Sequence, residues 1–172
     1  NMSITAKSLT SSDIKFADID AQKWTGSASK PALVITDGTY TLVEGKDFKA
    51  TWKDNVSVGN ATVTVEGING RYKDKLQKNF AISSKSISDG KIVNNYKPST
   101  KNDLSGYTAA DSVLKNEMYN DGKDVKATFA VVDANNNKLE EGRDYTVEYK
   151  DNKNVGTATI TITGKGSYEG TL

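Results

Sequence analysis

The chain has 172 residues, and 23 lysine and arginine residues balance 22 aspartate and glutamate residues to a formal net charge of +1. This balance argues against a nucleic-acid or membrane-surface partner, because either would leave a basic surplus. The sequence has no cysteine and no histidine, which excludes disulfides, thiolate or histidine metal sites, and catalysis by cysteine or by a serine–histidine–aspartate triad. We expect no cofactor. We also expect no membrane insertion, since no apolar stretch approaches the roughly 20 residues of a spanning helix.

One unit occurs twice in the chain. The stretch NMSITAKSL from Asn1 matches NFAISSKSI from Asn79, an offset of 78 residues, and EGKDF from Glu44 matches EGRDY from Glu141, an offset of 97 residues. The second copy therefore holds an insertion of about 19 residues. We predict two domains, residues 1–83 and residues 84–172, with the insertion near residues 90–118.

The first copy reads as short strands joined by turns. An apolar run, residues 32–35 (ALVI), is followed by the turn-forming pair Asp37-Gly38. Residues 48–52 (FKATW) and 61–65 (ATVTV) alternate apolar and polar side chains, which is typical of a strand with one solvated face. Residues 53–55 (KDN) predict the turn between them, and residues 79–82 (NFAI) the last strand.

The second copy repeats this order. Inside the insertion, residues 108–118 (TAADSVLKNEM) are the sole helical candidate. Residues 129–132 (FAVV) predict a strand, residues 133–137 (DANNN) a turn, and residues 145–149 and 158–162 two further alternating strands. Short strands with glycine, asparagine and aspartate turns predict an all-β protein built from two tandem β-sandwich domains, the second with an inserted loop or short helix.

Both copies carry the motif G-x-D-[FY]-x-x-x-[WY]-x-[DN]-N-x-x-x-G-x-A-T-[VI]-T-[VI]-x-G followed by an aromatic residue. The first copy adds Trp24-Thr25-Gly26 and Pro31, whereas the second opens with Tyr119-Asn-Asp-Gly122 and has no proline there. This pattern resembles the immunoglobulin-like tandem repeats of Gram-positive cell-surface and secreted proteins. In the second copy the motif residues are Gly142, Asp144, Tyr145, Tyr149, Asp151, Asn152, Gly156, Ala158, Thr159, Ile160, Thr161, Ile162, Gly164 and Tyr168.

The resemblance implies small sandwiches strung in series in a large extracellular protein. It implies no chemistry, because such repeats space, stiffen or present other modules, and some bind surfaces or glycans. Cysteine avoidance in a strand protein rich in threonine, asparagine and lysine also favours an exported Gram-positive protein, secreted or cell-wall associated. Its expected partners are neighbouring repeats and an extracellular glycan or protein.

The ends of the chain are out of phase with the repeats. No signal peptide is visible at Asn1, so we expect a mature chain or a segment of a longer one. The strand equivalent to residues 79–82 is missing after Leu172, whereas the first residues look like the last strand of a preceding unit. An exposed edge of this kind predicts head-to-tail pairing with residues Met2–Thr5 of a neighbouring chain.

Three aromatic residues are the candidate binding residues. Tyr96 and Tyr107 lie in the insertion, and loops over a rigid scaffold often carry binding residues; the insertion could equally cover a sheet edge. Trp24 could stack on a sugar ring. Trp24 and Trp52 have aromatic counterparts at Tyr119 and Tyr149, however, which favours core positions for both.

The remaining candidates are oxygen ligands and carboxylates. Asp133, Asn135 and Asn137 place oxygen donors at alternate positions, as a calcium loop begins, but Lys138 stands where the loop needs glycine, so a hairpin turn is favoured. A hydrolase would need two carboxylates across a cleft, drawn from Asp18, Asp20, Glu140, Glu141 and Asp144. The repeated Glu44/Glu141 and Asp47/Asp144 pairs are explained by a turn.

The sequence thus favours a non-catalytic spacer, stalk or adhesion module. A carbohydrate-binding module that grips a glycan through exposed aromatics is the alternative. A fragment of a carboxylate-dependent hydrolase is the third and least favoured interpretation. We expect no catalytic residues.

Overall fold

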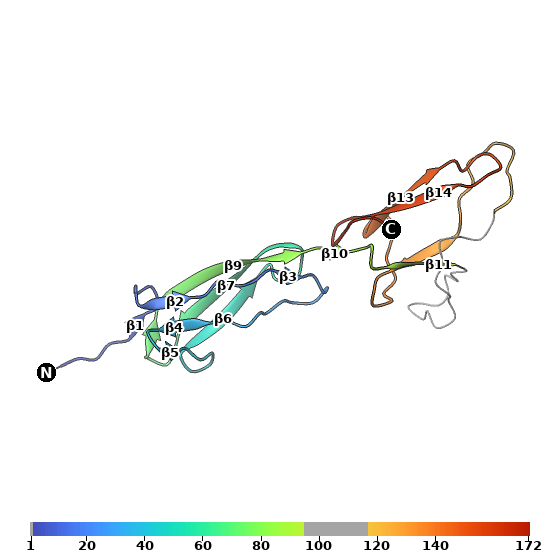
Figure 1. Ribbon diagram of the computed structural model, residues 1–172. Coiled ribbons are helices and arrows are strands. Elements are labelled where there is room, and N and C mark those ends of the chain that lie inside the picture. Colours follow the sequence, from blue (N-terminus) through green and yellow to red (C-terminus); the bar gives the residue numbers. More distant parts are fainter. Residues whose placement is uncertain (1, 95–116) are drawn as a thin grey trace. The chain divides into compact units, whose positions relative to one another are not determined.

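The computed structural model describes residues 2–94 and 117–172. The chain divides into two compact units, Asn1–Ser83 (unit 1) and Ser84–Leu172 (unit 2). The described residues form strands and turns and no helix, so the expected all-β class is confirmed at this level (Figure 1). No helix in these two ranges is long and apolar enough to cross a bilayer. Most of the helical candidate at 108–118, like Tyr96 and Tyr107, lies outside the described residues.

Unit 1 has two sheets and a strand pair. The four-stranded sheet has the order β3-β9-β7-β6, the three-stranded sheet the order β2-β4-β5, and β1 pairs with β8. The pairs β7–β9 and β6–β7 are antiparallel, whereas β3–β9 and β1–β8 are parallel. The strands are β1 (Lys7–Ser8), β2 (Ile14–Phe16), β3 (Gln22–Lys23), β4 (Ile35–Asp37), β5 (Tyr40–Thr41), β6 (Phe48–Lys53), β7 (Gly59–Gly67), β8 (Tyr72–Lys73) and β9 (Lys75–Ser83).

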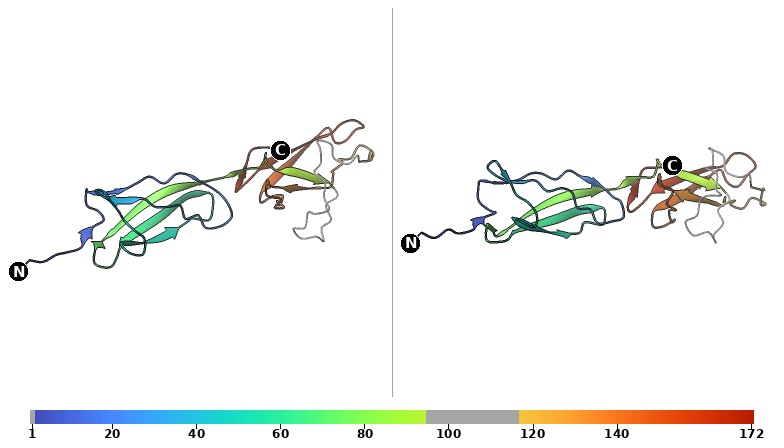
Figure 2. Two further views of the ribbon diagram at one scale, coloured as in Figure 1. Left: turned by 60° about the horizontal axis from the view of Figure 1, so that its bottom comes forward. Right: turned by 90° about the horizontal axis from the view of Figure 1, so that it is seen from below.

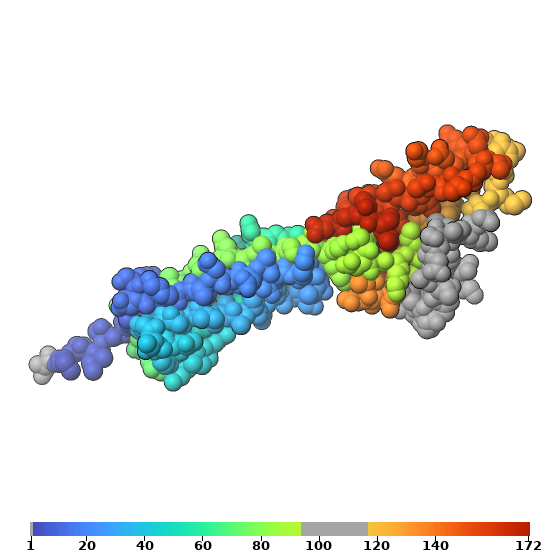
Figure 3. Space-filling view, viewed as in Figure 1, coloured from blue at the N-terminus to red at the C-terminus, as the bar shows by residue number. Residues whose placement is uncertain are grey.

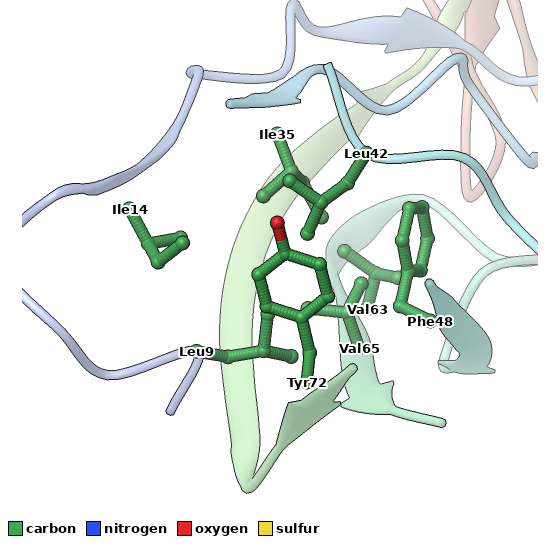
Figure 4. Packing of buried hydrophobic residues seen from close by; sticks show 8 residues of the cluster. All are labelled: Leu9, Ile14, Ile35, Leu42, Phe48, Val63, Val65 and Tyr72. Carbon is green, nitrogen blue, oxygen red and sulfur yellow. The ribbon is translucent and has the colours of Figure 1, made fainter. Parts of the chain in front are cut away.

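One apolar cluster joins the two sheets of unit 1. It draws Ile14 and Ile35 from the three-stranded sheet and Val63 and Val65 from the four-stranded sheet, with Tyr72 beside them (Figure 4). The predicted alternation of β6 and β7 is confirmed, because the threonines and lysines between the apolar residues stay wholly or partly exposed. Burial of one face of each sheet is what holds these short strands together.

The chain passes through unit 1 from end to end. It enters at the N-terminal tail before β1 and leaves at the C-terminal end of β9, at the opposite end of this unit (Figure 2). Strand β9 runs almost the whole way between them and pairs with β7 from Lys75–Glu66 to Ile82–Gly59. Unit 1 thus has its entry and exit at opposite ends.

Unit 2 repeats part of this arrangement. Strands β10 and β15 pair in parallel as β1 and β8 do, and β11–β12 and β13–β14 form antiparallel pairs. Beyond Thr163 and Thr171, which form an isolated bridge, the described residues provide no strand in the place of β9. The strands are β10 (Lys85–Ser86), β11 (Lys91–Asn94), β12 (Phe129–Val132), β13 (Tyr145–Lys150), β14 (Thr159–Gly164) and β15 (Tyr168–Glu169).

Candidate functional site

A lysine, an aspartate and a tyrosine meet in each unit. In unit 1, Lys7 Nζ donates to Asp37 Oδ1 at 2.6 Å and the Tyr72 hydroxyl donates to Asp37 Oδ2 at 3.2 Å. Asp13 Oδ2 lies 3.1 Å from the same Lys7 Nζ. We call this set, and its equivalent in unit 2, the Lys–Asp–Tyr cluster.

In unit 2 the cluster consists of Lys85, Asp133 and Tyr168. Lys85 Nζ donates to Asp133 Oδ2 at 2.8 Å, and the Tyr168 hydroxyl donates to the same oxygen at 3.3 Å. Here the carboxylate is more deeply enclosed, since the Asp133 side chain is 2 % exposed whereas the Asp37 side chain is 20 % exposed. Unit 2 therefore holds the stronger electrostatic site.

The parallel strand pairs explain why these side chains meet. Lys7 stands opposite Tyr72 in the β1–β8 register, and Lys85 stands opposite Tyr168 in the β10–β15 register. Directly paired residues of neighbouring strands point to the same side of a sheet. The aspartate comes from a third segment: Asp37 is the last residue of β4, and Asp133 directly follows β12. In each unit, three separate segments therefore meet at one carboxylate.

The pKa values show what each cluster can do. Burial alone would raise the pKa of Asp133, but hydrogen bonds from Lys85, Asn137 and the backbone N–H of Asn135 lower it to about 2. Burial and the neighbouring Asp133 charge raise the pKa of Tyr168 to about 12. At neutral pH the site therefore holds an ionised Asp133 carboxylate that accepts a hydrogen bond from a protonated Tyr168 phenol.

The calcium candidate is a hairpin turn in the structure. Asp133 Oδ1 accepts hydrogen bonds from the backbone N–H groups of Asn135 and Asn137, both at 2.9 Å, and Asn137 Nδ2 donates to Oδ2 at 3.1 Å. Asn136 takes a positive φ of 62° and a bridge joins Val132 to Lys138. In the described ranges, no group of three or more acidic, histidine or cysteine side chains could hold a metal ion. The oxygens of Asp133 are already committed to protein donors.

The second repeated carboxylate, Asp47, stabilises a turn in unit 1. Asp47 is fully buried, and its Oδ2 accepts from the Val43 N–H at 2.9 Å and from the Tyr40 hydroxyl at 2.8 Å. Its Oδ1 makes no hydrogen bond but faces Arg71 Nη1 at 3.2 Å. Burial opposes ionisation, yet these donors and the arginine charge hold the pKa of Asp47 below its usual value.

Asp144 occupies the equivalent turn of unit 2. Its Oδ2 accepts from the Glu140 N–H at 2.9 Å, and Arg143 donates to both carboxylate oxygens, Nε at 3.0 Å and Nη2 at 2.8 Å. The pKa of Asp144 is lowered because these hydrogen bonds outweigh its burial. A general acid needs a raised pKa, so this geometry fits the turn role expected for the Asp47/Asp144 pair.

The other acidic candidates lie at the surface. Glu44, Glu140 and Glu141 are exposed. Asp18 is fully exposed and pairs with Lys78 Nζ at 2.7 Å, and this hydrogen bond lowers its pKa. The lowered pKa of Asp18 is the opposite of what a carboxylate proton donor requires.

The aromatic candidates divide between core and surface. Trp24 and Trp52 are partly buried against a small cluster of Ala61, Phe80 and Ile82, and Trp52 meets Phe80 edge-on with ring centroids 5.7 Å apart. The core position expected for these tryptophans is confirmed in that sense. For the counterpart Tyr119 it is wrong, because Tyr119 is 56 % exposed.

Sequence reasoning missed the lysine and the tyrosine of the Lys–Asp–Tyr cluster. The signal was present: Lys7 and Lys85 fall within the repeated K-S-[IL] stretch, and Tyr72 and Tyr168 are the repeated aromatic residue after the motif.

Compared with protein-family models, with curated proteins and with solved structures, the chain gives no significant match.

Proposed function

We propose that this chain is a non-catalytic extracellular module of a larger bacterial surface or secreted protein, made of two immunoglobulin-like β-sandwich repeats that act as a spacer, stalk or adhesion segment. The observation that carries the proposal is the Lys–Asp–Tyr cluster, present in both units. A cluster at which three segments meet around one ionised carboxylate is a structural tie. Its chemistry is that of holding strands together.

The position of the tie in unit 1 supports a load-bearing role. Strand β1 is the first strand after the chain enters, and the cluster fixes it to β8 and to the end of β4. The exit lies at the far end of β9 (Figure 2). Tension between entry and exit would therefore pull along β1, and its hydrogen bonds and the Lys7–Asp37 contact would have to break together.

Force spectroscopy on the full chain between two handles tests this role. We expect two separate unfolding events, each lengthening the chain by the contour length of its unit, about 300 Å for roughly 83 residues, less the distance that the folded unit already spans. Lys7→Met should lower the unfolding force of one event, and Lys85→Met should lower that of the other. The force depends on the barrier to unfolding, which the Lys–Asp–Tyr cluster raises in each unit. Unfolding at negligible force for both units, unaffected by either substitution, would contradict the spacer proposal.

A glycan-binding role has one observation in its favour, the exposure of Tyr119. Affinity electrophoresis in polysaccharide gels separates the two functions. Retardation of the chain that Tyr119→Ala or Tyr107→Ala removes would favour the carbohydrate-binding alternative. Partly buried Trp24 is unsuited as a first choice, because its substitution would also disturb the cluster of Ala61, Phe80 and Ile82.

A further inference from the structure

One asparagine side chain joins two surface turns of unit 1. The turn of residues 67–71 connects β7 to β8, and the turn of residues 43–47 precedes β6. Asn69 Nδ2 donates to the carbonyl oxygen of Lys46 at 3.2 Å and to that of Gly45 at 3.5 Å. In the space-filling view, light-blue and cyan atoms, which include the turn before β6, form the surface of unit 1 near the point where the chain enters (Figure 3).

The setting of Asn69 makes its side chain reactive. It is the only asparagine of the sequence that is followed by glycine. Asn69 and Gly70 are both exposed, and apart from the chain neighbours no atom lies within 4 Å of the position that a Cβ of Gly70 would take. Without a Cβ, the backbone at Gly70 adopts many conformations. Its nitrogen is therefore accessible to the side chain of the preceding asparagine.

We propose that Asn69 is a site of spontaneous deamidation, with water as the co-reactant. The Gly70 nitrogen attacks Cγ of Asn69, the bond between Cγ and Nδ2 breaks, and ammonia leaves with the proton that the Gly70 nitrogen loses. Water then opens the resulting cyclic imide at either of its carbonyl groups, which gives aspartate or isoaspartate. The net change is the hydrolysis of one amide, so the reaction needs no oxidant and no cofactor.

The reaction separates the two turns. The amide group of Asn69 is a donor, whereas the ionised carboxylate that replaces it can only accept hydrogen bonds. The carbonyl oxygens of Gly45 and Lys46 then face a negative charge in place of an N–H group. Isoaspartate also lengthens the backbone of the turn by one carbon atom, two residues before Arg71, which pairs with the buried Asp47. Deamidation therefore loosens the turn that holds Asp47.

Unit 2 makes the same connection without an asparagine. Its turn between Gly164 and Tyr168 is one residue shorter than the turn between the equivalent residues of unit 1. Lys165 Nζ donates there to the carbonyl oxygen of Gly142, the equivalent of Gly45, at 2.7 Å. A lysine side chain has no amide to hydrolyse. Ageing of the protein should therefore weaken unit 1 alone.

Peptide mapping by mass spectrometry, after incubation of the full chain in mildly alkaline buffer, tests the reaction. Asn136 is an internal control, because it is exposed and its φ of 62° is close to the 56° of Asn69, but asparagine follows it. Asn69 should convert at least tenfold faster than Asn136, and more slowly in mildly acidic buffer, since the attacking nitrogen must lose its proton. Equal rates at both residues, or no conversion of Asn69 while a free peptide of residues 65–73 converts completely, would overturn the proposal.

Two variants test the effect of the reaction on unit 1, which contains both tryptophans. Asn69→Gln keeps an amide donor but must form a larger imide ring, so incubation should leave its urea midpoint of tryptophan fluorescence unchanged. Asn69→Asp should lower that midpoint without incubation, and incubation of the unsubstituted chain should lower it at least as far. An incubated chain that is converted at Asn69 but keeps its midpoint would overturn the loosening of the turn.

Discussion

Asp133 shows how one residue can be both buried and charged. Five donor contacts surround its two oxygens, from Lys85, Tyr168, Asn135 and Asn137. A buried carboxylate without such donors would be protonated or strongly destabilising. The tie in unit 2 therefore depends on the charge of this residue, and acid should weaken it.

The acid dependence of unit 2 follows from the pKa of Asp133. The pKa of Asp133 is about 2 in the folded chain, whereas its ordinary value is 3.8. As the pH falls, the folded state therefore binds the proton only at a lower pH than the unfolded state does. At about 1.4 kcal/mol per pKa unit, Asp133 therefore contributes about 2 kcal/mol to the free energy of unfolding of unit 2. This stabilisation is fully present above about pH 4 and is lost as the pH falls to about 2. Asp133→Asn should remove this part of the acid dependence.

Carboxyl NMR titration measures the pKa of Asp133 directly, and urea unfolding at several acidic pH values measures its contribution to stability. An Asp133 carboxyl that titrates at its ordinary value in the folded chain would refute the tie.

Loss of the lysine should have unequal effects in the two units. Lys85→Met leaves the Asp133 charge buried beside an apolar side chain, and we expect unit 2 to lose about 3 kcal/mol, as when one partner of a buried ion pair is removed. Lys7→Met should cost less, since Asp37 is 20 % exposed and water can replace the ammonium group.

The two tryptophans distinguish the units in this comparison, because both belong to unit 1. Lys7→Met should shift the urea midpoint of tryptophan fluorescence and Lys85→Met should not. Hydrogen exchange of the β10 and β15 amides reports the loss in unit 2. Equal effects of both substitutions on tryptophan fluorescence would show that the ties are not local.

At the scale of elements, β7 and β8 approach closely at Gly67. A Cβ atom on Gly67 would lie 2.4 Å from the carbonyl carbon of Tyr72, and on the equivalent Gly164 it would lie 2.8 Å from the Glu169 nitrogen. Both neighbours are backbone atoms, which cannot move aside as a side chain can. The glycine that ends the repeated motif is therefore required by the close approach of the next strand's backbone, β8 in unit 1 and β15 in unit 2.

Gly67→Ala should destabilise unit 1 by about 1–3 kcal/mol, the usual cost of forcing extra volume into a packed site. Asn60→Ala, an exposed position on the same strand, should change the free energy of unfolding by less than about 0.5 kcal/mol. Urea unfolding followed by tryptophan fluorescence measures both variants. A neutral Gly67→Ala would mean that β8 can shift without cost.

The sequence predicted the elements whose signal is local. The alternation in β6, β7 and β13 and the turn role of Asp47 were all visible, because a period of two and a repeated turn are written in neighbouring residues. The parallel β1–β8 pair was not predicted, since strands of two residues have no periodicity and their partner is more than sixty residues away. The lysine tie depends on that pairing.

The repeat comparison also had a limit in unit 2. Matching Tyr119 to Trp24 predicted a buried aromatic, but the cluster that covers Trp24 uses Phe80 and Ile82 of β9. The described residues of unit 2 include no strand equivalent to β9, so no such side chains cover Tyr119. An aligned residue inherits its burial only if the segments packed on it are repeated too.

At the scale of the whole molecule, the duplication gives two units with the same ties but different amounts of sheet. Unit 1 has a four-stranded sheet in which β7 is paired on both edges. In the described part of unit 2, β14 pairs with β13 along one edge, whereas its other edge is bonded only from Ile162 to Gly164, and Ala158 is exposed where Ala61 is fully buried. Burial of apolar surface is the main favourable term in folding, so the stabilities of the two units should differ.

Unit 2 should therefore unfold at a lower urea concentration than unit 1. Far-UV circular dichroism, which sees both units, should show two transitions, and tryptophan fluorescence, which sees unit 1, should follow only the second. Coincident transitions by both signals would show that the two units unfold as one.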